Sequence, residues 1–102
     1  MKILKAKQAR TFLEKSKGLL GEKESYPLFF QTRWGIHTFG MRFPIDVVIL
    51  TDDYTVYKVK QNLKANHFFF WNPIYKNVLE LPEGTIQKEK LELKERIKLI
   101  FQ

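Results

Sequence analysis

The stretch that decides the fold runs from Ile36 to Val48 and reads IHTFGMRFPIDVV. From residue 37 to residue 46 the odd positions are His37, Phe39, Met41, Phe43 and Ile45, and the even positions are Thr38, Gly40, Arg42, Pro44 and Asp46. An extended backbone with this alternation buries one face and exposes the other. Residues 47–50 are then continuously apolar, which is typical of a strand covered on both faces. The stretch therefore predicts β-structure.

Further strands are predicted on both sides of this stretch, at residues 1–5, 28–31, 54–60, 76–81 and 96–101. Asp52 and Asp53 are expected to form the turn of a hairpin. Apolar residues at positions 9, 12, 13, 19 and 20 predict one N-terminal amphipathic helix that ends near Leu20, before Gly21. A short C-terminal helix is expected from Thr85 to about Lys90. The predicted fold class is mainly β: a compact antiparallel β-sandwich or barrel of six or seven short strands, in a single domain over residues 1–102.

Composition excludes several kinds of chemistry. The 102 residues include no cysteine, so disulfides, zinc–thiolate sites and thiol catalysis are excluded. No phosphate-binding loop or nucleophile elbow is present, so an enzyme is not favoured and neither a cofactor nor a metal site is predicted. The apolar runs are too short for a signal peptide or a membrane span, and a cytoplasmic protein that does not enter the membrane is expected.

Six residues are candidates for binding a ligand: His37, Thr38, Met41, Arg42, Asp46 and Trp71. We expect a polar pocket between residues 37–46 and the aromatic stretch 68–71, in which Arg42 binds a small anionic or sugar-like ligand. In the structural alternative, His37 is a satisfied histidine at the edge of the core. Arg42 and Asp46 then pair or cap a turn, and Met41 fills a gap in the core.

Three other interpretations involve the same part of the chain. A hydrolase-like enzyme would use His37 with Asp46 as its orienting carboxylate, and a soft-metal site would use His37, Met41 and His67; neither is favoured. Residues 68–71 are four aromatics in succession, so at least one of them is expected at the surface or under a loop. They form either a stacking platform for sugars or bases, or a loop that covers the core.

The formal charge of +7 lies mostly at the two ends of the chain. Basic and acidic residues number 7 and 3 in residues 1–25, 6 and 5 in residues 26–85, and 5 and 3 in residues 86–102. Nucleic acid is therefore a possible partner but not a favoured one. If a polyanion binds, the basic ends are expected to hold it, through Lys2, Lys5, Lys7, Arg10, Lys15 and Lys17.

The stretch from Ile36 to Val48 resembles the domain of unknown function 192 family. Other landmarks of the family follow in order: Gly18-Leu19-Leu20, Asn62-Leu63-Lys64, and the run from Val78 to Gly84. The resemblance covers residues from about 9 to 100 and implies a compact, mainly β domain whose biochemical activity is not established. Lys90 and Lys94-Glu95 stand where relatives usually carry turn glycines, so those turns are expected to differ in shape.

Overall fold

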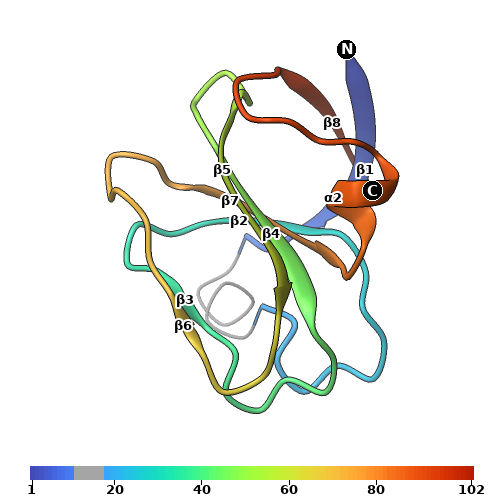
Figure 1. The fold of residues 1–102 in the computed structure, drawn as a ribbon, viewed down its shortest axis with the longest axis vertical. Helices are drawn as coiled ribbons and strands as arrows, with labels where there is room; N and C mark the ends of the chain where they lie inside the picture. The colour runs from blue at the N-terminus through green and yellow to red at the C-terminus, as the bar shows by residue number, and fades with distance from the viewer. Residues whose placement is uncertain (11–17) are drawn as a thin grey trace.

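The computed structural model describes residues 1–10 and 18–102 (Figure 1). These residues form strands β1 (Lys2–Gln8), β2 (Leu28–Gln31), β3 (Ile36–His37), β4 (Ile45–Leu50), β5 (Val56–Leu63), β6 (Phe68–Phe69), β7 (Asn77–Pro82) and β8 (Ile97–Phe101), with helix α2 (Thr85–Lys88) between the last two. The prediction of a mainly β protein is confirmed, and so is the short helix after Gly84.

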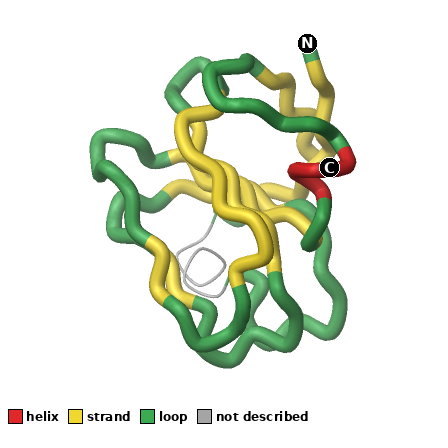
Figure 2. Tube along the Cα trace, in the orientation of Figure 1, coloured by secondary structure: helices red, strands yellow, loops and turns green. Residues whose placement is uncertain are grey.

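Six of these strands form one curled sheet in the order β5-β4-β7-β2-β1-β8, and β3 pairs with β6 in a separate ribbon (Figure 2). The antiparallel prediction is wrong for part of the sheet, because β1 runs parallel to both β2 and β8. β1 and β8 come from the two ends of the chain, and β1 and β2 are separated by residues 9–27, so local sequence patterns carry no information about either pairing. The predicted sandwich is not confirmed.

The curl brings the two edges of the sheet together at one end. A bridge joins Thr55, just before β5, to Arg96, just before β8. Two backbone bonds reinforce it: the amide of Val56 donates to the carbonyl of Glu95 at 2.8 Å, and that of Ile97 donates to the carbonyl of Tyr54 at 3.0 Å. These bonds pair backbone groups that an open edge would leave exposed.

Apolar clusters cover both faces of the sheet. Val48 and Leu50 of β4 belong to one cluster, whereas Val47 and Ile49 belong to the other. Every residue of β4 is buried, which confirms the prediction that residues 47–50 form a strand covered on both faces.

The predicted alternation from residue 37 to residue 46 is wrong. β3 ends at His37 and β4 begins at Ile45, and turns lie between them. Burial is inverted at several positions: Thr38 is 1 % exposed and Asp46 is completely buried, whereas Phe39 is 44 % exposed. The hydrogen bonds of Thr38 and Asp46, described below, explain why these two polar side chains lie inside.

The predicted N-terminal helix falls largely on residues 11–17, which lie outside the described residues. Gly18 and Gly21, which follow them, have φ angles of 52° and 76°. No helix in the described part of the chain is long and apolar enough to cross a membrane.

Candidate functional site

Asp46 is a structural carboxylate at the centre of the fold. Its Oδ1 accepts a hydrogen bond from the amide of Asn62 at 3.0 Å, and its Oδ2 accepts one from the amide of Ile86 at 2.9 Å. Asn62 has a φ of 55° and lies where the pairing of β4 with β5 shifts register. Gly84 offers no side-chain cap to α2, so Asp46 satisfies a free amide at the start of the helix. Asp46 thus joins β4 to the bulge of β5 and to α2.

Thr38 is also used within the fold. Its hydroxyl donates to the carbonyl of Lys64 at 2.6 Å and accepts from the amide of His67 at 3.0 Å, so it holds the loop that precedes β6. Met41 and Trp71 are each 8 % exposed and pack in the second apolar cluster. The indole Nε1 of Trp71 donates to the carbonyl of Tyr75 at 2.6 Å. Four of the six predicted site residues are therefore buried.

The other two predicted residues, His37 and Arg42, are exposed. The Nδ1 of His37 accepts a hydrogen bond from the amide of Phe39 at 3.3 Å. Arg42 makes no hydrogen bond or ion pair with any described residue. No contact in the described part of the chain brings all six residues together, and His37 and Asp46 bond to different partners rather than to each other. Among the described residues, no group of three or more histidines and carboxylates could hold a metal ion.

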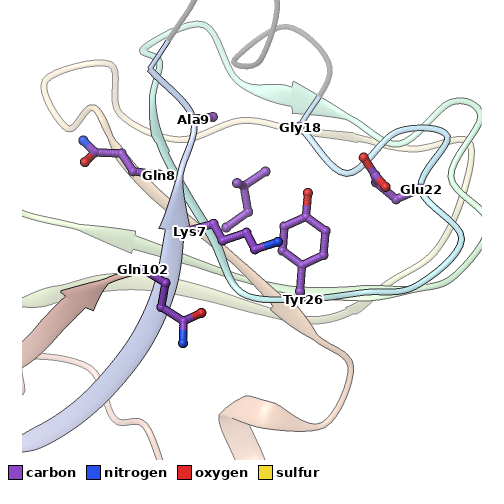
Figure 3. A pocket seen from close by; sticks show the side chains of 8 residues that line it. Lys7, Gln8, Ala9, Gly18, Glu22, Tyr26 and Gln102 are labelled. Carbon is purple, nitrogen blue, oxygen red and sulfur yellow. The ribbon is translucent and has the colours of Figure 1, made fainter.

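A cavity of about 340 Å³ lies elsewhere, beside the end of β1 and the start of β2 (Figure 3). The Nζ of Lys7 lies 4.8 Å from the centre of the Tyr26 ring, and these two side chains face each other in the cavity. Buried Ala9 and Leu28 add apolar surface. The described residues that line the cavity are Lys7, Gln8, Ala9, Gly18, Glu22, Tyr26, Leu28 and Gln102.

Glu80 lies next to this cavity without lining it. It pairs with Leu28 across β7 and β2, and a Cβ atom on Gly18 would lie only 3.2 Å from its Oε1. Glu80 is 4 % exposed, and its Oε1 has no hydrogen-bond partner among the described residues. Burial raises the pKa of Glu80 from 4.5 to about 7, opposed by a hydrogen bond from the backbone of Leu19. The sequence signal for this group was a charged residue inside the apolar run from Val78 to Leu81.

The basic residues of the N-terminal segment have separate surroundings. Lys2 donates to the carboxylate of Glu95 at 3.0 Å and also to the carbonyl of Lys90. Lys7 faces the cavity, Lys5 is exposed, and the Nε of Arg10 donates to the side chain of Gln8 at 3.3 Å. Lys15 and Lys17 lie outside the described residues. Binding of a polyanion by these ends stays a prediction.

Comparisons with known proteins identify relatives but no activity. The family model DUF192, described as Uncharacterized ACR, matches residues 1–99. A search of curated proteins found no match.

Two crystal structures share the fold. A protein of unknown function from Novosphingobium aromaticivorans DSM 12444 is 18 % identical, with a TM-score of 0.79 over 89 % of this chain and 71 % of that one. The other structure comes from Sinorhizobium meliloti 1021, and its description suggests a transcription regulator. It is 16 % identical, with a TM-score of 0.74 over 89 % of this chain and 78 % of that one. At these identities the likeness shows the fold alone.

Proposed function

Because the chain belongs to the DUF192 family, whose description assigns no activity, we propose its function from its own geometry: a non-catalytic module that binds a small organic anion in the cavity beside β1. This keeps the class of function expected from the sequence and moves the site away from residues 37–46.

The position of Lys7 carries the proposal. Its ammonium group is held over the ring of Tyr26 at 4.8 Å, and no described carboxylate lies within ion-pair distance of it. Attraction to the ring favours this position without neutralising the charge. Glu22 also lines the cavity but makes no ion pair with Lys7, so an anionic group of a ligand can supply a countercharge that no described residue provides.

The size and lining of the cavity limit the ligand. A volume of about 340 Å³ is at the low end of small-molecule sites, which span roughly 300–1,000 Å³. Leu28 and Ala9 offer apolar contact, and the amides of Gln8 and Gln102 can hydrogen-bond to polar groups. These features suit a metabolite-sized carboxylic acid with a short apolar body.

Glu80 makes such binding depend on pH. Its carboxyl group lies beneath Gly18, one of the residues that line the cavity. With a pKa raised to about 7, Glu80 is mostly neutral in mildly acidic solution and ionised in alkaline solution. A negative charge beneath the cavity repels an anion, so affinity should fall as the pH rises through about 7.

Titration of the protein with lactate, succinate and benzoate, followed by amide chemical shifts in NMR spectra, tests the proposal. We expect shifts around Lys7 and Leu28, and weaker binding by Lys7→Gln. The exposed Lys5, two residues earlier on β1, does not line the cavity, so Lys5→Gln is the matched control and should bind like the unmodified protein. Equal binding by the two variants, or shifts confined to other surfaces, would overturn the proposal.

A further inference from the structure

A second binding surface lies on the β3–β6 ribbon, away from the cavity. His37 pairs with Phe68 and Ile36 pairs with Phe69. Side chains alternate between the faces of a strand, and here Phe69 is 8 % exposed whereas Phe68 is 61 % exposed. His37 and Phe68 therefore belong to the outward face, and ring contacts place Phe39 and Phe70 beside them.

The outward face carries a continuous row of rings, which we call the aromatic row: His37, Phe39, Phe68 and Phe70. Neighbouring ring centres lie 5.5 Å apart for His37 and Phe39, 5.0 Å for Phe39 and Phe68, and 5.8 Å for Phe68 and Phe70. Phe39, Phe68 and Phe70 are 44 %, 61 % and 60 % exposed. Apolar residues exposed singly are common on soluble proteins, whereas a contiguous group of exposed large aromatics marks an interaction surface.

The backbone under the row is adapted to it. Gly35 has a φ of 87°, and a Cβ atom there would lie 2.5 Å from the ring of Phe70. Only glycine lets Phe70 lie this close to the neighbouring strand. On the other side, the ammonium of Lys58 donates to the carbonyl of Phe70 at 3.2 Å and lies 5.2 Å from the ring centre of Phe69.

The segments 26–45 and 54–79, which contain the ribbon, carry six basic residues and no acidic residue, so their formal charge is of one sign. Lys58 and Arg33 bond to backbone carbonyls at the Phe70 end. At the other end Thr38 bonds to the backbone of Lys64, and Arg42 follows on the next turn.

The acidic residues of the middle of the chain lie elsewhere. Asp46 and Glu80 are buried, and Glu83 directly precedes Gly84, the residue at the start of α2. Asp52 and Asp53 form the hairpin turn between β4 and β5, at the end of the molecule away from the ribbon (Figure 1). The net charge of residues 26–85 is small, but the acidic residues lie away from the aromatic row, so the surface around the row is basic.

We propose that the aromatic row and its basic surroundings bind single-stranded nucleic acid, by stacking of unpaired bases on Phe39, Phe68 and Phe70 and by contact of the backbone phosphates with Lys64, Arg42 and Lys58. Exposed rings combined with a positively charged track are the features by which proteins hold single strands without sequence preference. A duplex hides its base faces, so it cannot use the rings. The surface is distinct from the cavity, and neither proposal depends on the other.

Fluorescence anisotropy of a labelled single-stranded oligothymidylate tests this inference. We expect binding at low salt that weakens as salt is added, and much weaker binding to a duplex of the same length. Phe68→Ala and Phe70→Ala should each reduce affinity roughly 5- to 100-fold, since one base loses its stacking partner. Leu93→Ala, which removes an equally exposed apolar side chain from another part of the surface, should leave affinity unchanged.

The phosphate contacts have a separate signature. Lys64→Ala should lower the slope of log affinity against log salt by about 0.7, the value for one phosphate contact on a single strand. Lys88→Ala on α2 is the matched control and should not change the slope. Three results would overturn the proposal: no binding at low salt, equal affinity in the phenylalanine variants and the unmodified protein, or preferential binding to phosphatidylglycerol vesicles.

Discussion

The centre of the sheet buries charged side chains, whereas the β3–β6 ribbon exposes large apolar ones. In β4 and β7 the carboxylates of Asp46 and Glu80 are 0 % and 4 % exposed. On the ribbon, Phe68 and Phe70 are 61 % and 60 % exposed. Burying a carboxylate and exposing a large aromatic ring both cost free energy, so each needs a compensating role.

The compensation differs between the two regions. Asp46 is compensated inside the protein, because both of its oxygens accept hydrogen bonds from backbone amides. Glu80 is compensated only in part, since one oxygen has no partner in the described part of the chain. The rings of the aromatic row contact one another but stay largely exposed, and a bound partner would cover them. Polar residues therefore stabilise the fold here, and the exposed aromatics are left for binding.

Asp46→Ala should give the largest loss of stability. It leaves the buried amide of Ile86 and the partly buried amide of Asn62 without their acceptor, and each such group costs about 1–3 kcal/mol. We expect the free energy of unfolding in urea to fall by roughly 4 kcal/mol, which can abolish folding altogether. Asp52→Ala, in the exposed hairpin turn, is the control and should change it little. Similar unfolding curves for the two variants would contradict the role assigned to Asp46.

Glu80→Gln should have a smaller effect that depends on pH. The folded state holds the proton of Glu80 more tightly than the unfolded chain, with a pKa of about 7 against 4.5. The contribution of this proton to stability is therefore complete below pH 4.5 and is lost as the pH rises through about 7. The total change amounts to roughly 3 kcal/mol.

Urea unfolding over this range of pH measures the effect. The unmodified protein should lose stability relative to Glu80→Gln as the pH increases, so the variant is the more stable of the two in alkaline solution. Parallel profiles for the two proteins would show that Glu80 does not titrate as its burial implies.

The sequence predicted the strands of the sheet well, because their signals are local. Residues 28–31 form β2 as predicted, and the continuous apolar run became the doubly covered β4. The prediction that at least one aromatic of residues 68–71 lies at the surface or under a loop is confirmed by Phe68 and Phe70. The four successive aromatics were thus a usable signal that some of the rings in this segment are exposed.

The burial of Asp46 and Thr38 and the pairing of β1 depend on contacts between residues far apart in the chain. The partners that bury Asp46 lie 16 and 40 residues away in the chain, and the carbonyl that binds the hydroxyl of Thr38 lies 26 residues away. A pattern of alternation cannot reveal such partners, so both residues were expected in a pocket and are found in the interior. The parallel pairing of β1 with β8 joins the two ends of the chain and leaves no local signal either.

Phe68→Ala should have the smallest effect on stability and is the most direct test of the division between folding and binding. Its exposed ring adds little to the core, so the free energy of unfolding should change by no more than about 0.5 kcal/mol. Affinity for single-stranded oligothymidylate, measured on the same sample, should fall roughly 5- to 100-fold. A variant that loses stability but keeps its affinity would contradict the account.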